Sequence, residues 1–127
     1  KLGSPDLICL IGYMRILSPE FIRAFPKKII NVHPALLPKF GGMGMYGDHV
    51  HEAVLASGEK ESGMTIHYVT EDVDAGEIIL QKKCEITENE TVTSLKAKVQ
   101  ALEKEGYVEA LEKLSASLPL SPAYIFG

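Results

Sequence analysis

"KKIINVHP", residues 27 to 34, has the pattern of a short β-strand that ends in polar side chains. Alternation along an extended chain places Ile30 on one face of this strand and Asn31 with His33 on the other. Pro34 restricts the residue before it to an extended backbone and helps to end the strand. The strand therefore brings an amide and an imidazole together where the regular backbone stops.

The segments around this strand predict an α/β fold. An apolar run before it, 6–13, is typical of a buried parallel strand, and 17–26 predicts a short helix. Further strands are expected at 63–69 and 77–86, and helices at 48–58 and 91–114. Gly106 is expected to mark a break in the last helix, and the tail 119–127 to be irregular. This order favours a mostly parallel sheet, flanked by helices, with antiparallel strands near the C-terminal end.

Composition places the chain among ordinary globular domains. Its 127 residues and 46% hydrophobic content predict one domain, 1–127, with a real core. A net charge of −4 without a basic stripe argues against a nucleic-acid partner, and no apolar run approaches a membrane span. Cys9 and Cys84 lie in apolar runs without a CxxC pair, which predicts reduced thiols in a cytoplasmic protein. The chain lacks an initiator Met, and we expect a fragment.

Candidate chemistry rests on Asn31, His33 and Asp74. An asparagine amide can stabilise a developing oxyanion, and a histidine can move protons near neutral pH. A carboxylate beside the imidazole would favour its charged form. Together they suggest acyl transfer without a protein nucleophile. A second interpretation stays open, because a polar strand end with a hydrogen-bonded histidine and no catalytic role gives the same pattern. In addition, nothing in the sequence spacing shows that Asp74 lies near His33.

Three stretches carry a family resemblance: "GYMRIL" (12–17), "NVHPALLPKF" (31–40) and "GMTIHYVTEDVDAGEIILQ" (63–81). With their spacing, they resemble the phosphoribosylglycinamide formyltransferases, within the wider folate-dependent formyltransferase family. The resemblance runs from about Pro5 into the last helix. It implies a cytoplasmic purine-biosynthesis enzyme that transfers a formyl group from 10-formyltetrahydrofolate, as co-substrate, to the amine of glycinamide ribonucleotide. It implies no metal.

The resemblance also implies roles for single residues. Asn31 would hold the oxyanion, His33 would act as general acid, and Asp74 would raise the pKa of His33. Folate would be bound by two segments, namely Met14, Arg15, Ile16 and Leu17, and Tyr68, Val69, Thr70, Glu71, Asp72 and Val73. Glu103 would contact the ribose of the nucleotide, although an exposed helical charge is an equal alternative. His51 would lie near the substrate entrance. His67 would pack beside the catalytic residues and help to orient them.

Several departures leave alternatives open. The family's N-terminal half, with a glycine-rich phosphate-binding loop, has no counterpart here, so this chain alone is expected to be weakly active or inactive. The loop 41–48 is longer than the corresponding loop of the family, and it is interpreted either as a mobile apolar flap or as a surface insertion. His49 and His51 invite a metal reading, but a helix would place them on different faces. Formyltetrahydrofolate hydrolysis and non-catalytic folate binding remain alternatives, and the chain could be a monomer or a homodimer.

Overall fold

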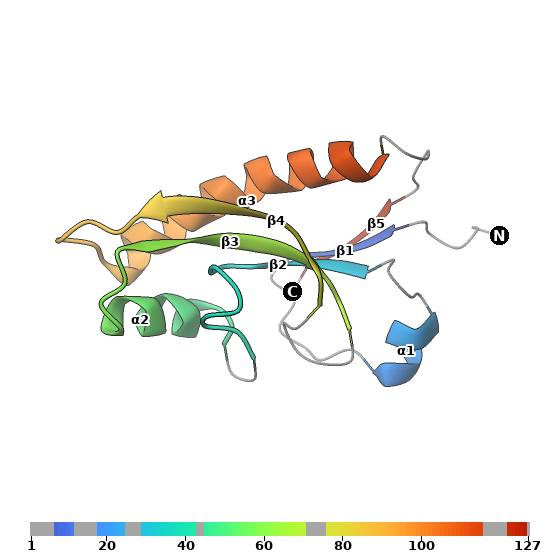
Figure 1. Ribbon diagram of the computed structural model, residues 1–127, viewed down its shortest axis with the longest axis horizontal. Coiled ribbons are helices and arrows are strands. Elements are labelled where there is room, and N and C mark those ends of the chain that lie inside the picture. Colours follow the sequence, from blue (N-terminus) through green and yellow to red (C-terminus); the bar gives the residue numbers. More distant parts are fainter. Residues whose placement is uncertain are drawn as a thin grey trace.

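The computed structural model describes residues 7–11, 18–24, 29–42, 45–70, 76–115 and 122–126; of β1, β5 and Ser115 it describes the backbone alone. Strands and helices alternate along the first half of the chain, and a long helix follows the last antiparallel pair (Figure 1). The elements are β1 (Leu7–Ile11), α1 (Pro19–Ala24), β2 (Ile29–His33), α2 (Asp48–Ala56), β3 (Glu61–Tyr68), β4 (Ile78–Glu85), α3 (Val92–Ser115) and β5 (Pro122–Phe126).

One sheet joins all of these strands in the order β4-β3-β2-β1-β5. β1 pairs in parallel with both β2 and β5, whereas β2–β3 and β3–β4 are antiparallel. The expected α/β class, with antiparallel strands in the second half of the sheet-forming sequence, is therefore confirmed for β3 and β4, whereas β5 pairs in parallel. The switch from parallel to antiparallel pairing falls at β2, the strand that carries Asn31 and His33.

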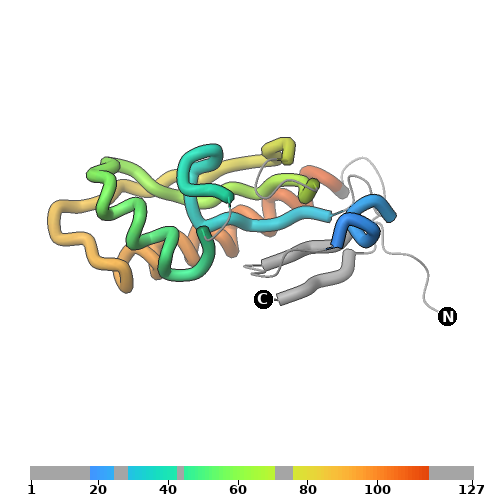
Figure 2. The backbone as a smooth tube through the Cα atoms, turned by 90° about the horizontal axis from the view of Figure 1, so that it is seen from below, coloured from blue at the N-terminus to red at the C-terminus, as the bar shows by residue number. Residues whose placement is uncertain are grey.

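The apolar face of the sheet packs against α3. Ile30 and Val32 of β2 and Met64 and Ile66 of β3 are buried in one cluster, joined by apolar side chains of both long helices: Val50, Val54, Leu95, Val99, Tyr107 and Ala110. Seen from below, α2 and the loop after β2 lie in front of the sheet and α3 lies behind it (Figure 2). The alternation of β2 therefore gives its apolar side chains to the core under α3 and leaves its polar side chains on the opposite face.

Local signals start and stop the helices as the sequence predicts. The Ser18 hydroxyl accepts a hydrogen bond from the backbone N–H of Phe21 at 3.2 Å, and Pro19 occupies the first turn of α1. Gly58, at φ 77°, follows α2 in the left-handed conformation that glycine adopts without a Cβ clash.

The expected break at Gly106 is wrong, because α3 continues through it. A Cβ atom at this position would lie 2.5 Å from Cε of Met64. The glycine therefore lets the helix backbone approach β3 closely, and tertiary packing outweighs its poor helix propensity.

The tail was expected to be irregular, and this is also wrong for residues 122–126. They form β5, which lies beside β1 with Leu7 opposite Pro122 and Ile11 opposite Phe126. The pairing joins segments more than a hundred residues apart, so no local pattern announces it; an edge of β1 accepts the backbone hydrogen bonds of a distant segment.

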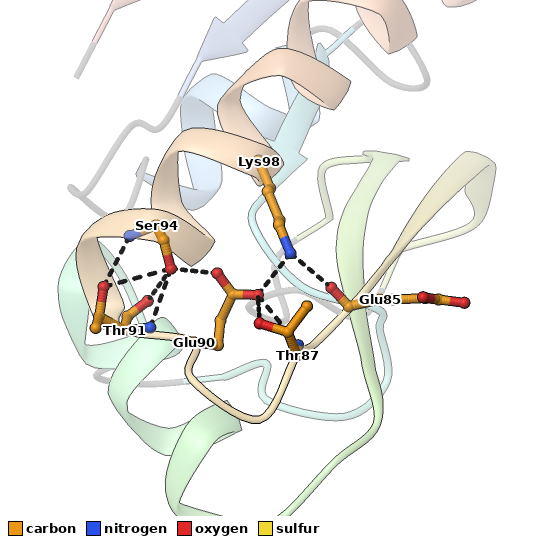
Figure 3. Close-up of polar contacts among 6 residues, drawn as sticks. All are labelled: Glu85, Thr87, Glu90, Thr91, Ser94 and Lys98. Carbon is orange, nitrogen blue, oxygen red and sulfur yellow. Dashed lines mark hydrogen bonds and ion pairs between the residues drawn. The ribbon is translucent and has the colours of Figure 1, made fainter.

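A polar network closes the N-terminal end of α3 (Figure 3). Thr91 and Ser94 cap the first turn reciprocally, since each side-chain oxygen accepts the other residue's backbone N–H at 3.1 and 3.0 Å. The Glu90 carboxylate accepts hydrogen bonds from Ser94 and, at 2.6 Å, from Lys98. Its side chain is only 2% exposed, and the bonds from Lys98 and Ser94 lower its pKa to about 2.

This network predicts a pH dependence of stability. The pKa of Glu90 is lower in the folded protein than its ordinary 4.5, so its stabilising effect is present above pH 4.5 and is lost as the pH falls toward 2. Glu90→Gln should therefore lower the free energy of unfolding at pH 7 and make it less sensitive to pH between 4.5 and 2. Urea unfolding across that range measures both effects, with the exposed Glu88→Gln as control. Parallel pH curves for wild type and Glu90→Gln would contradict the assignment.

Candidate functional site

The polar face of the sheet collects the candidate side chains of two strands. In the antiparallel pair β2–β3, Asn31 lies opposite His67 and His33 lies opposite Thr65. Directly opposite residues project from the same face of a sheet, so all four side chains share one face. His33, Thr65 and His67 are buried, and Asn31 is partly buried. The expectation that Asn31 and His33 point the same way is confirmed.

Asn31 carries a buried acceptor that finds no partner among the described residues. Its Oδ1 atom is shielded from solvent and accepts no hydrogen bond there. A buried polar atom without a partner costs free energy, and such atoms often mark places where a ligand binds. The amide of Asn31 is therefore placed to meet a polar group from a bound molecule.

His33 is held by the loop that follows its own strand. Its ring is 3% exposed, and Nε2 lies 2.6 Å from the backbone carbonyl oxygen of Phe40. Because a carbonyl only accepts, Nε2 carries the proton in this contact. Phe40 has φ 57°, which is unusual for a residue with a side chain. The residues 34–40, which we call the 34–40 loop, thus leave β2 at His33 and return to touch it.

His51 brings a second imidazole to the same region from α2. It is 3% exposed, and its Nδ1 atom has no hydrogen-bond partner in the described part of the chain. Burial lowers the pKa of His51, the nearby positive charges of Lys96 and His33 lower it further, and Asp48 opposes them. The His51 pKa therefore lies below the ordinary value of an imidazole, mainly because the ring is buried. His49, by contrast, is exposed beside Glu52, as expected for histidines on different helix faces.

His67 is buried on β3, and Glu103 is half-buried on α3. His67 is buried, and its Nδ1–H donates to the Tyr68 carbonyl at 3.0 Å, which fixes the ring against its own strand. Glu103 is half-buried on α3, so the alternative of a freely exposed helical charge is wrong. Burial raises its pKa to about 7. No hydrogen bond or ion pair holds this carboxylate within the residues described.

Many of the predicted site residues lie outside the described residues. They are Asp74, Met14, Arg15, Ile16, Leu17, Glu71, Asp72 and Val73. Of the second predicted folate segment, Tyr68 and Val69 are partly buried and Thr70 is exposed. Their roles stay predictions.

The anchors of the segment that carries Asp74 are nevertheless described. The N–H of Val69 donates to the Ile29 carbonyl at 2.8 Å, and the N–H of Tyr68 donates to the Glu77 carbonyl at 2.9 Å. These two hydrogen bonds lie near the start of β2, because Tyr68 is opposite Ile30. His33 is the last residue of β2, about 10 Å further along the strand. Asp74 is two residues from Gly76, a reach of about 7 Å before its side chain is counted.

Two polar residues that the sequence analysis did not single out lie on the same face. Thr65 and Gln81, opposite each other in β3 and β4, hydrogen-bond to the 34–40 loop. Strand alternation could have found Thr65, which is two residues before His67. The role of the Phe40 carbonyl has no sequence signal, because every residue has one.

Neither a metal centre nor a membrane span emerges from the residues that are described. No three His, Cys, Asp or Glu side chains gather there as possible metal ligands. The helices in the described ranges are all too short or too polar to cross a bilayer. Cys84 is a half-buried free thiol on β4, and burial raises its pKa, as for a structural rather than a reactive cysteine.

Comparison with known proteins agrees with this fold. Residues 1–111 match the family described as "Formyl transferase", and the chain therefore belongs to the formyl transferase family. Within that family, it is similar to proteins named phosphoribosylglycinamide formyltransferase. The chloroplastic protein of Arabidopsis thaliana is 46% identical over 106 residues, which are 84% of this chain and 36% of that protein. The Escherichia coli protein is 38% identical over 82% of this chain and 47% of its own length.

Solved structures of the same name share the fold. The Coxiella burnetii phosphoribosylglycinamide formyltransferase, solved in complex with CHES, is 43% identical with a TM-score of 0.79, over 89% of this chain and 51% of its own. The Anaplasma phagocytophilum structure is 29% identical with a TM-score of 0.81, over 96% and 63%. This chain thus spans between about a third and two thirds of these relatives.

Proposed function

We propose that this chain forms the catalytic, folate-binding part of an enzyme that transfers a formyl group from 10-formyltetrahydrofolate to glycinamide ribonucleotide. The observation that carries the proposal is the pairing of Asn31, with an unpartnered buried oxygen, and His33 on one polar face. The names of the relatives support the choice of acceptor. Residues 1–127 would act as one structural unit within the longer protein.

The proposed reaction needs neither a metal nor a protein nucleophile. The amine nitrogen of the acceptor attacks the formyl carbon, and the carbonyl oxygen becomes an oxyanion. The Asn31 amide, turned so that its N–H faces the substrate, and the His33 imidazolium stabilise that charge. The bond from carbon to the folate nitrogen then breaks as a proton passes from the amine to that nitrogen. Asp74 would favour the charged form of His33.

The remaining residues would bind the two substrates. Residues 14–17 and 68–73 would surround the pterin, and His51 and His67 would pack behind the catalytic pair. Because burial lowers the pKa of His51, this ring carries less positive charge near His33 than an ordinary histidine would. Glu103 would accept hydrogen bonds from the ribose hydroxyls, which suits a carboxylate that has no partner within the described residues.

The direct test is an assay of the full-length protein with 10-formyltetrahydrofolate, with and without glycinamide ribonucleotide. Formyl transfer that depends on the acceptor is the expected result. Release of formate without acceptor would instead identify a hydrolase. Saturable folate binding with no turnover, even at saturating acceptor, would identify a non-catalytic folate-binding protein.

The raised pKa of Glu103 predicts that its charge destabilises the unliganded fold. The pKa of this carboxyl rises from 4.5 to about 7 on folding, so the free energy of unfolding of the protein falls as the pH rises through that range. Glu103→Gln should therefore unfold with a free energy higher by on the order of 1–2 kcal/mol at pH 8, allowing for partial solvent exposure, and unchanged at pH 4. Thermal unfolding at both values measures it, with the exposed Glu105→Gln as control. A gain that is equal at both pH values would refute it.

A further inference from the structure

Thr65 holds the 34–40 loop through two of the three hydrogen-bonding positions of its hydroxyl, and Gln81 occupies the third. Thr65 is fully buried on β3. Its Oγ1 donates to the Ala35 carbonyl at 2.7 Å, and accepts from the Leu37 N–H at 3.1 Å and from Nε2 of Gln81 at 3.0 Å. A hydroxyl offers one donor and two acceptor sites, so none is left over.

Gln81 completes this arrangement from β4. Its Nε2 atom also donates to the Leu37 carbonyl at 2.9 Å, so both amide hydrogens have a partner. Together, the Thr65–Gln81 pair binds three backbone atoms of the loop: the carbonyls of Ala35 and Leu37 and the N–H of Leu37. The loop is therefore fixed to the sheet by side chains rather than by strand pairing.

The same loop ends at the group that holds His33. Phe40 follows the fixed Leu37 by three residues, and its carbonyl accepts from Nε2 of His33 at 2.6 Å. Its left-handed backbone, at φ 57°, is unfavourable for phenylalanine and persists only where surrounding contacts impose it. The Thr65–Gln81 pair fixes the buried part of the loop before Phe40, and the exposed ion pair of Lys39 with Glu59, at 2.9 Å, holds the residue next to it.

We propose that Thr65 and Gln81 are positioning residues, which fix the 34–40 loop so that the Phe40 carbonyl sets the tautomer and orientation of His33. The hydrogen bond at one imidazole nitrogen decides which nitrogen carries the proton. With Nε2–H held by Phe40, Nδ1 is the atom at which the imidazole gains and loses its second proton. The inference rests on the proposed function only for its effect on turnover, not for its effect on the ring.

Histidine NMR on the full-length protein tests the effect on the ring. The ¹⁵N shifts of the histidine rings, four of which belong to residues 1–127, distinguish the tautomers at about pH 8, above the ordinary imidazole pKa of about 6.5. His33→Ala assigns the His33 signals. Wild type should show His33 as the Nε2–H tautomer. Thr65→Val, which keeps the shape and removes the hydroxyl, should show exchange between tautomers, and Thr65→Ser should restore the wild-type signals.

Turnover gives the second measurement. Thr65→Val should lower kcat by roughly 10- to 100-fold, the scale of a displaced catalytic group, while KM for the folate changes little. Ser62→Ala is the matched control, because the Ser62 hydroxyl on the same strand is buried and has no partner among the described residues. If Thr65→Val fails to fold, Gln81→Met is the second variant, because it removes the other side chain of the pair on the edge strand β4. It should show the same tautomer exchange of His33 and a smaller decrease in kcat.

The outcomes separate this inference from the proposed function. If His33 stays in the Nε2–H form and kcat stays within twofold in both Thr65→Val and Gln81→Met, the positioning role is wrong. If wild type transfers no formyl group, the proposed function fails, and the NMR comparison still decides whether the pair holds the ring of His33.

Discussion

Replacing His33 by alanine is expected to lower kcat for formyl transfer by at least about 100-fold, and Asn31→Ala should do the same. One oxyanion donor or one general acid usually contributes on this scale. The two side chains lie on one polar face of β2, where a bound formyl oxygen could meet both. Steady-state kinetics of the full-length protein with purified glycinamide ribonucleotide measures the effect.

The structure supplies controls that separate lost chemistry from lost stability. Asn31 Oδ1 has no hydrogen-bond partner in the described ranges, so Asn31→Ala should unfold no more easily than wild type. His49→Ala removes an exposed histidine of α2 and should keep turnover within about twofold. Near-normal turnover in either His33→Ala or Asn31→Ala would remove that residue from the mechanism.

A large loss of stability is expected from a substitution at Gly63. A Cβ atom there would lie 1.9 Å from the Lys82 carbonyl oxygen and 2.9 Å from Cδ2 of Leu36. The first clash is with the backbone of the neighbouring strand, which can yield only if β3 and β4 separate. We expect Gly63→Ala to lower the free energy of unfolding by about 3 kcal/mol or more, the upper range for overpacking.

Gly58→Ala is the matched comparison for this prediction. Gly58 has φ 77°, but no heavy atom lies within 4 Å of the position that a Cβ atom would take, so alanine there meets backbone strain without a clash. Its cost should be about 1 kcal/mol. Urea unfolding of both variants decides the matter: equal losses would show that the close approach of β4 to Gly63 does not limit stability.

Sequence reasoning succeeded where short-range patterns control structure. Period-two alternation placed Asn31 and His33 on one face, and Ser18 with Pro19 marked the start of α1, because strand faces and helix caps depend on neighbouring residues alone. It failed at Gly106 and at β5, where the deciding contacts are with Met64 and with β1, far away in the chain. Glycine propensity and tail composition carry no information about such distant partners.

The sequence by itself therefore determined the α/β class, the polar end of β2 and, through its motifs, the resemblance to formyltransferases. Only the tertiary structure decided that Thr65 and Gln81 hold the 34–40 loop, that the Phe40 carbonyl holds His33, and that burial sets the pKa of His51 and Glu103. The physical reason is that side-chain identity and alternation are local properties of the chain. Hydrogen-bond partners and desolvation depend on which distant segments come to lie against each residue.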